Sequence, residues 1–406
     1  MRQLFLTRFP ILDIHGDVAG YDISPRDSGE GDELAPDVLF NTLTGSDLPP
    51  YLDAANPTFL PLKPEVVGPN LLSFLPADYP LVLELEAADL LARGQEPPFA
   101  AASGMIHEHH FAAALRITQR DWEGLAARRG EEPPCTGWDY VVIPAEDARE
   151  GLGPGHFPGL AGEILVRGVT TPADFEFLSH GEFALYEGPF YAEPMDLSVQ
   201  ALRPDRAGAI RALNAVLRDQ DVDRVVALLQ DYPDLVLRLL GLLNSPVFRR
   251  TTKITSVERA VVLLGYRELS RWLSLLLFMG DTDEYQPSLL FREAYLRGAL
   301  IQRVLERVGL SREDARGGYL AGILAVLQAL LHQPANRMAA DLDLGDAIQA
   351  ALIDRSGPIG EALAVVERLR GSDWLEEEPE VAGVALPVVA LYGDESEVTR
   401  ETIGDF

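Results

Sequence analysis

The pattern of apolar and polar positions changes near residue 197 of this 406-residue chain. Before that point, apolar runs of strand length alternate with stretches rich in proline and glycine. The runs predict strands over 59–62, 81–85, 111–117, 140–143 and 163–169, followed by a short helix over 172–181. Strands separated by helix-capable segments indicate an α/β domain with a mainly parallel sheet.

After residue 197 the chain becomes leucine-rich, and its apolar residues recur at helical spacing. One helix is predicted over 231–243, and a second begins at the capping-box pattern Thr255-x-x-Glu258 and ends at Gly265. Further helices are predicted over 266–279, 289–309, 314–331, 346–354 and 358–369. We therefore expect an α/β domain over 1–196, an all-α domain over 197–370, and an acidic C-terminal tail over 371–406 that is packed or partly disordered.

Composition and charge limit the classes of function. Apolar residues make up 47% of the chain and charged residues 24%, as in globular proteins. The formal net charge is -29, of which residues 1–196 carry -21, a field that disfavours nucleic acid and membrane surfaces as partners. There is no apolar run long enough to span a membrane, no signal-peptide pattern and only one cysteine, Cys135. A cytoplasmic location is the simplest expectation.

The helical half contains a recognisable pattern over residues 239–277. A helix ends in an Asn-Ser pair, a loop follows, and an Ile-x-Ser start leads into a helix that runs from an alanine to Leu-Gly. The positions concerned are Asn244, Ser245, Ile254, Ser256, Ala260, Leu264 and Gly265. This pattern resembles the HDOD family, which is similar to the HD phosphohydrolases but lacks their metal ligands. The resemblance puts Ala325 and Val326 where a catalytic His-Asp pair would stand, and neither side chain can bind a metal.

Two features of this pattern have alternative interpretations. Asn244 and Ser245 precede Pro246, so they form either a structural helix terminus, which we favour, or part of a ligand site. The densest basic cluster of this half comprises Arg249, Arg250 and Lys253. That cluster is either a solvated loop or a docking patch for an acidic partner, with nucleic acid as a further alternative.

The N-terminal half carries a second resemblance, which begins in the stretch Gly20–Asp27. Asp22-Ile23-Ser24-Pro25-Arg26 follows a first strand and matches a Glu-Ala-Leu-x-Arg motif with aspartate in place of glutamate. Glu84 matches a later acidic ligand, and 166–194 resembles the end of the same domain. Residues 1–194 thus resemble the EAL cyclic di-GMP phosphodiesterases, and the whole chain resembles EAL-plus-HDOD signalling proteins. The resemblance implies a TIM-barrel-derived fold.

The departures from the EAL pattern decide the expected chemistry. Pro61 stands at an asparagine position, Val142-Ile143-Pro144 replaces a Lys-x-Asp strand, Arg167 replaces a glutamate and Glu187 replaces a glutamine. An EAL phosphodiesterase uses several carboxylates to hold two divalent ions. Asp22 and Glu84 alone cannot supply that cage, and Arg167 places a positive charge in it. We therefore expect a relic site at Asp22, Arg26, Glu84 and Glu187, with no catalytic residue, cofactor or metal.

The resulting hypothesis is a non-catalytic signalling scaffold that acts by protein-protein interaction through its HDOD domain. Two alternatives stay open: a cyclic di-GMP receptor without hydrolysis, and a residual metal-dependent phosphodiesterase. Arg26 would clamp a phosphate in a receptor, or it would be structural and paired with Asp22 or Asp27. His107, His109 and His110 form the only histidine cluster, and we interpret them as a polar strand or loop and not as a zinc site.

Overall fold

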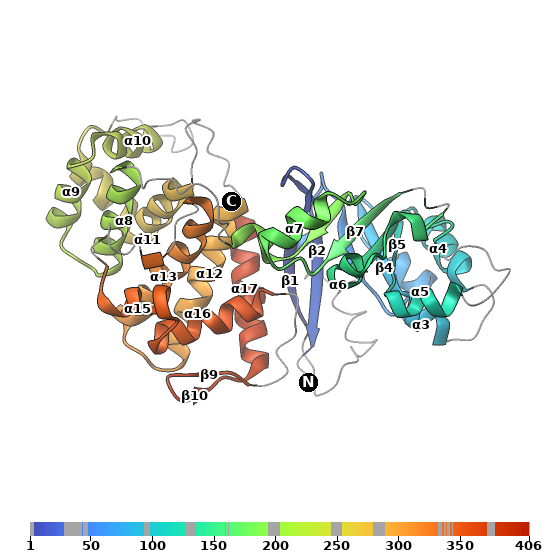
Figure 1. Cartoon of the computed structure of the whole chain (residues 1–406). Helices are drawn as coiled ribbons and strands as arrows, with labels where there is room; N and C mark the ends of the chain where they lie inside the picture. Colours follow the sequence, from blue (N-terminus) through green and yellow to red (C-terminus); the bar gives the residue numbers. More distant parts are fainter. Residues whose placement is uncertain are drawn as a thin grey trace. The chain divides into compact units, whose positions relative to one another are not determined.

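The computed structural model of the chain describes residues 4–27, 43, 48–92, 98–126, 135–158, 160, 162–193, 204–244, 254–278, 289–331, 335–336, 338, 342, 344–371 and 378–405. The chain divides into two compact units (Figure 1). One unit comprises Met1–Tyr191 together with Val388–Asp405, and the other is formed by Ala192–Pro387. The chain therefore leaves the first unit after Tyr191 and returns to it near its C-terminus.

The first unit is built on a closed barrel of eight strands. They are β1 (Leu4–Asp13), β2 (Val18–Asp27), β3 (Thr58–Pro61), β4 (Leu81–Glu86), β5 (Ala112–Arg116), β6 (Tyr140–Pro144), β7 (Glu163–Arg167) and β8 (Leu185–Glu187). Strand β1 runs antiparallel to β2 and β8, and the other neighbouring strands pair in parallel. The expected TIM-barrel-derived α/β fold is confirmed.

The inside of the barrel is filled by one apolar layer. Every strand except β2 contributes one buried side chain to it: Ile11, Phe59, Val82, Ala114, Val142, Leu165 and Leu185. Helices α3 (Ala87–Ala92), α4 (Pro98–Glu108), α5 (Gln119–Ala126), α6 (Ala145–Glu150) and α7 (Pro172–Ser179) follow individual strands. Two residues further along β4, β7 and β8, at the next positions on the same side of each strand, stand Glu84, Arg167 and Glu187, so charged side chains follow directly on this apolar layer.

The apolar runs predicted as strands correspond to β3, β4, β5, β6 and β7, and the short helix predicted over 172–181 is α7. The antiparallel pairing at the start of the chain was not predicted. Strands β1 and β2 form a hairpin around Gly16, whose φ of 82° lies in the left-handed region. The stretch Gly20–Asp27 is therefore part of a strand and not a turn.

The second unit is helical. It contains α8 (Pro204–Leu217), α9 (Val222–Gln230), α10 (Pro233–Leu243), α11 (Val257–Phe278), α12 (Leu289–Arg307), α13 (Arg312–Leu331), α15 (Asp346–Asp354) and α16 (Gly357–Leu369). The short strands β9 (Glu380–Val381) and β10 (Val384–Ala385) pair with each other. The helices predicted from leucine spacing are present, whereas α8 and α9 were not predicted individually. None of the described helices combines the length and apolar character needed to cross a lipid bilayer.

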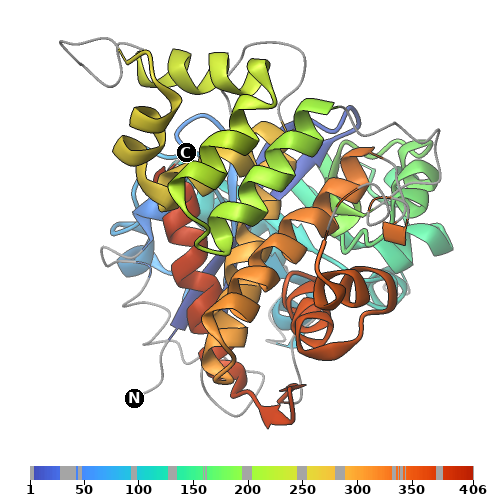
Figure 2. The ribbon, with the colours of Figure 1, turned by 90° about the vertical axis from the view of Figure 1, so that its left-hand side faces the viewer.

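Helices α12 and α13 lie side by side and approach very closely (Figure 2). A Cβ atom at Gly322 would stand 2.6 Å from the Cα of Gly298, so any side chain at Gly322 would collide with the neighbouring backbone. On the same contact, a Cβ at Gly318 would meet Leu305 at 2.3 Å. Glycines at these positions let the two helices pack backbone against backbone, which fixes the centre of the helical unit.

Helix α11 contains a sharp break. Gly265 has φ 74° and ψ 162°, which no helical residue adopts and which strongly favours glycine. The two helices predicted on either side of Gly265 are therefore both present, and they meet directly at this kink.

The C-terminal segment forms a further helix, α17 (Val388–Asp405), which belongs to the barrel unit. Leu391 and Val398 on this helix are fully buried. The part of the expected acidic tail that follows Pro387 is therefore a packed helix.

Candidate functional site at the centre of the barrel

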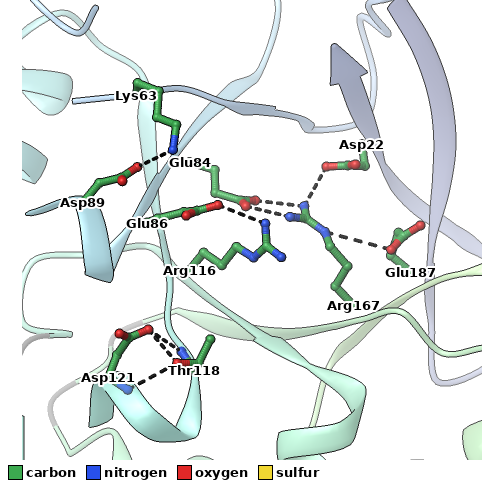
Figure 3. Close-up of polar contacts among 10 residues, drawn as sticks. All are labelled: Asp22, Lys63, Glu84, Glu86, Asp89, Arg116, Thr118, Asp121, Arg167 and Glu187. Atoms are coloured by element: carbon green, nitrogen blue, oxygen red, sulfur yellow. Dashed lines mark hydrogen bonds and ion pairs between the residues drawn. The ribbon is translucent and has the colours of Figure 1, made fainter. Parts of the chain in front are cut away.

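Four charged side chains from four strands meet inside the barrel (Figure 3). Asp22 lies on β2 and Glu84 on β4, while Arg167 and Glu187 are the last residues of β7 and β8. Strands β7 and β8 pair in parallel, with Arg167 directly opposite Glu187. The barrel thus places the guanidinium of Arg167 among three carboxylates.

The guanidinium makes short contacts with two of these carboxylates. Its Nη1 and Nη2 atoms donate to the two carboxylate oxygens of Glu84 at 2.6 and 2.8 Å, and Nη2 also donates to Asp22 at 2.6 Å. The Nε atom lies 3.9 Å from a carboxylate oxygen of Glu187. The side chains are 1% exposed for Glu84 and 13% exposed for Arg167. Water therefore has little access to this ion cluster.

Burial and charge shift the pKa of two groups in the cluster. Burial raises the pKa of Asp22 to about 7; Arg167 opposes the rise, and Glu187 and Glu84 add to it. For Arg167, burial alone would lower the pKa, but the charges of Asp22 and Glu84 outweigh burial and raise it. Arg167 therefore keeps its charge, whereas the carboxyl of Asp22, with its raised pKa, binds a proton more readily than an ordinary aspartate does.

The cluster does not fit the divalent ions that the EAL resemblance implies. Such an ion needs carboxylate oxygens with free lone pairs and no cation beside them. Here both oxygens of Glu84 and one oxygen of Asp22 already accept hydrogen bonds from Arg167. Across the described part of the chain, no three His, Cys, Asp or Glu side chains are placed to hold a metal ion. Arg167 thus bonds to carboxylate oxygens that a metal ion would need as ligands.

Two further ion pairs lie at the ends of neighbouring strands and were not singled out from the sequence. Arg116, the last residue of β5, donates to Glu86 on β4 at 3.1 Å, and Lys63 donates to Asp89 at 3.0 Å (Figure 3). A signal was available, since Glu86 directly follows the predicted strand 81–85 and Arg116 lies one residue before the end of the predicted strand 111–117. These pairs are 27–41% exposed at their side chains, so they are weaker than the buried cluster.

The other relic positions are distributed as follows. Pro61 pairs in register with Glu84, and Val142 is a buried member of the apolar layer. The backbone of Arg26 lies on β2 opposite Phe5, and its side chain is outside the described part of the structure. Asp22, one of the two partners expected for Arg26, is bonded to Arg167, and the expected pairing of Arg26 stays a prediction. The cation of this site comes from β7.

In the helical unit, the amide of Asn244 joins two segments of backbone. Its Oδ1 accepts from the N–H of Ile254 at 2.8 Å, and its Nδ2 donates to the carbonyl oxygens of Ile254 at 2.8 Å and Leu240 at 2.7 Å. Both N–H donors and the oxygen of the amide are thus used within the fold. Asn244 holds the end of α10 to Ile254, which lies three residues before the start of α11.

The remaining signature residues occupy structural positions where they are described. Ser256 directly precedes α11, and its hydroxyl accepts the N–H of Arg259 at 3.3 Å, so the helix is capped one residue later than the capping box expected at Thr255. Ile254 and Ala260 are buried, and Gly265 forms the kink. Ser245, Arg249, Arg250 and Lys253 lie outside the described residues, so the basic patch stays a prediction.

Ala325 and Val326 lie on α13 and are buried. A buried ion cluster of the same helical unit was missed by the sequence analysis: Glu293 accepts from Arg297 at 2.8 Å and from Arg370 at 3.0 Å. Burial alone would raise the pKa of Glu293, but the two guanidinium groups outweigh it and lower the pKa to about 2. This cluster ties the end of α16 to α12.

The histidine cluster is not on a strand, contrary to one of the two expectations. His107 lies in the last turn of α4, and its Nε2 is 2.8 Å from the carboxylate of Asp139. His109 contacts the carbonyl oxygen of Met105, one turn earlier. These contacts hold the end of α4 and use the ring nitrogens locally.

Comparison with known proteins identifies the helical unit. Residues 204–341 match the family model of the HDOD domain. The barrel fold and this match together confirm the expected architecture, in which an EAL-like barrel precedes an HDOD domain. The match contains all the described signature residues, from Asn244 to Gly265.

Two curated proteins are similar to this chain. One is the uncharacterized protein YuxH of Bacillus subtilis (strain 168), 24% identical over 217 residues, which are 52% of this chain and 52% of that protein. The other is the cyclic di-GMP phosphodiesterase CdgJ of Vibrio cholerae serotype O1, 26% identical over 243 residues, which are 59% of this chain and 54% of that protein. The chain spans about half the length of these relatives.

Solved structures similar to this chain include EAL domains. The EAL domain of Mycobacterium smegmatis DcpA is 14% identical, with a TM-score of 0.34, and the match covers 45% of this chain and 89% of that one. The Xanthomonas citri FimX EAL domain, solved in complex with c-diGMP, is 10% identical, with a TM-score of 0.32, and the match covers 46% and 86%.

Proposed function

We propose that this protein is a non-catalytic regulator in cyclic di-GMP-related signalling, in which the HDOD domain binds a protein partner and the barrel is an inactive relative of the EAL phosphodiesterases. The observation that carries the proposal is Arg167. A phosphodiesterase of this class needs divalent ions to activate water and to neutralise the charge that develops on phosphorus. In this barrel a guanidinium bonds to the oxygens that would hold such ions.

The similarity to the cyclic di-GMP phosphodiesterase CdgJ supports the signalling context, and enzymatic activity is the competing proposal. A residual phosphodiesterase would have to expel Arg167 from a buried cluster of three carboxylates. Breaking such a buried ion pair costs about 3–5 kcal/mol. This cost favours the inactive barrel.

The decisive experiment incubates the full-length protein with cyclic di-GMP and Mg²⁺ or Mn²⁺ and follows the linear dinucleotide product, with an active EAL enzyme as positive control. We expect no product above the background. Turnover that is abolished by both Asp22→Ala and Glu84→Ala would refute the proposal. Turnover that survives both substitutions would point to a contaminating enzyme, which repurification would remove.

Nucleotide binding without hydrolysis is a second candidate function, supported only by the EAL-like barrel. The cations of the described site are each paired with a carboxylate, and residues 1–196 carry a net charge of -21. Both features oppose a dinucleotide with two phosphates. Calorimetric titration with cyclic di-GMP tests this candidate, and a saturable heat signal would establish a receptor.

The interaction role of the HDOD domain is tested at the predicted basic patch. Affinity capture with the full chain is compared for the Arg249→Ala, Arg250→Ala double variant and for Arg267→Ala, whose exposed arginine lies elsewhere on the same domain. We expect a specific partner to be lost with the double variant and kept with Arg267→Ala. Equal capture by both variants would exclude the patch as the docking site.

A further inference from the structure

The edge of strand β1 is only partly covered by the barrel. Strand β1 pairs with β2 from Leu4 to Leu12, but it pairs with β8 only over Ile11–Asp13. Residues 4–10 of β1 therefore have a second edge that no described strand occupies. Such an edge exposes N–H and C=O groups that must be paired or covered, because otherwise they favour association with other chains.

Helix α17 covers this edge with specific contacts. The N–H of Leu6 on β1 donates to the hydroxyl of Ser396 on α17 at 3.3 Å. The hydroxyl of Tyr51, in the short helix η1 (Pro49–Tyr51), donates to the carbonyl oxygen of Ser396 at 3.0 Å. Helix α17 (red) lies beside β1 (blue) in both views (Figures 1 and 2).

Close packing accompanies these hydrogen bonds. Gly393, one turn before Ser396, faces the ring of Phe5, and a Cβ atom there would lie 3.3 Å from Cε1 of that ring. A larger side chain would push the helix away from the strand. The same surface of α17 thus combines a bonded hydroxyl with a glycine that permits close approach.

We propose that the surface formed by β1 and η1 is a docking site for α17, and that the HDOD region is consequently an insertion within the barrel domain. The occupant is a named segment of this chain, Val388–Asp405, and its fit rests on the contacts of Leu6, Tyr51 and Phe5. The barrel domain is then discontinuous in sequence, and it needs α17 to cover the edge of β1. This inference is independent of whether the barrel is catalytic.

The first test uses the full chain with a site for a sequence-specific protease inserted between Pro387 and Val388. After cleavage, α17 is held only by non-covalent contacts, and we expect it to co-elute with the rest of the protein in size-exclusion chromatography. Gly393→Leu is expected to release the helix, whereas Arg400→Ala, an exposed position on the same helix, is expected to retain it. Release of the unsubstituted helix would overturn the docking site.

The second test needs no cleavage, so it remains informative if a cleaved chain unfolds. Hydrogen exchange is measured at the Leu6 amide of the intact protein. Ser396→Ala removes its acceptor, and exchange is expected to accelerate about 10-fold, the equivalent of one hydrogen bond. Arg400→Ala is expected to leave the rate unchanged. Unchanged exchange in both Ser396→Ala and Gly393→Leu would show that α17 does not protect β1.

Discussion

Arg167 and Glu84 form a two-bond ion pair inside the barrel, with Nη1–Oε1 at 2.6 Å and Nη2–Oε2 at 2.8 Å. Paired oxygens and nitrogens of this kind are the strongest arrangement of a guanidinium and a carboxylate. The pair joins β4 to β7, two strands that are not neighbours in the barrel.

Replacing Arg167 by glutamine should therefore destabilise the barrel. Three carboxylates would lose the cation that they share, and the expected loss is about 3–5 kcal/mol in the free energy of unfolding. Urea titration followed by circular dichroism measures this loss. Arg116→Gln is the matched control, since its pair with Glu86 is about 40% exposed and should be worth at most about 1 kcal/mol. Equal losses in the two variants would contradict the interpretation of the buried cluster.

The thermal stability of the wild-type protein should not change when a chelator removes divalent ions. Because Arg167 already bonds to the carboxylate oxygens of Glu84 and Asp22, dialysis against EDTA is expected to leave the melting temperature unchanged, and added Mg²⁺ or Mn²⁺ should not raise it. Differential scanning calorimetry provides the measurement. A reproducible rise with either ion that disappears in Glu84→Gln would reveal a metal site at this position.

The proton on Asp22 should make stability depend on pH. Its carboxyl has a pKa of about 7 in the folded protein and an ordinary value of 3.8 when unfolded, so between these values the folded state binds more protons. Stability then falls as the pH rises from about 4 to 7 and levels off above 7. The charged groups around Asp22 are Arg167, Glu187, Glu84 and Arg116.

Asp22→Asn removes this titration, so the stability difference between variant and wild type should move in favour of the variant as the pH increases from 5 to 7. Chemical denaturation at several pH values measures how this stability difference changes with pH. Asp22→Asn also removes the ion pair with Arg167, but that cost is the same at each pH and does not alter the slope. Glu86→Gln, at a half-exposed carboxylate, serves as the control. Parallel curves for Asp22→Asn and wild type would exclude a raised pKa at Asp22.

Asn244→Ala should destabilise the HDOD domain. The substitution removes three hydrogen bonds and leaves the N–H of Ile254 without its acceptor, with an expected cost of about 1–3 kcal/mol. Gln302→Ala removes an exposed amide that bonds only within its own helix, and it should change stability by less than about 0.5 kcal/mol. Thermal unfolding compares the two. A neutral Asn244→Ala would mean that the pairing with Ile254 carries little energy.

Two glycines of the helical unit should respond oppositely to alanine. Gly265→Ala forces a Cβ into a conformation with φ 74° and ψ 162°, at an expected cost of about 1–3 kcal/mol. Gly241→Ala, inside α10 with free space around it, should stabilise the protein by about 0.5–1 kcal/mol. The sign difference in unfolding free energy is the result to measure, and a stabilising Gly265→Ala would show that the kink is not required.

Most of the strands and helices could be predicted from the sequence, because the local spacing of apolar residues specifies each of them. The apolar run around Val82 and the leucines of α10 are examples, since their periods reflect which face is buried. Asp22, Glu84 and Arg167 were identified one by one from motif positions. Local spacing could not predict that these side chains touch, because Asp22 and Arg167 are 145 residues apart and meet only when the barrel closes.

The antiparallel hairpin and the position of α17 could not be predicted for the same reason. The sequence of strand β1 is mainly apolar but contains an arginine and a proline, and this pattern does not specify the direction of the neighbouring strand. The acidic residues before α17 led to the prediction of a tail in place of a helix. The side of α17 that packs on the barrel contacts Phe5 and Leu6, nearly four hundred positions earlier in the chain. Pairings of this kind are decided by tertiary packing.

The place of α17 also has a consequence for the order of events during synthesis. The ribosome makes β1 to β8 first, then the HDOD region, and α17 last. The HDOD region is continuous in sequence and is complete on the nascent chain before the barrel receives its final helix. Until α17 is made, the uncovered edge of β1 remains available to other polypeptides, which makes the interval between the synthesis of β1 and that of α17 the period of greatest risk for misassembly.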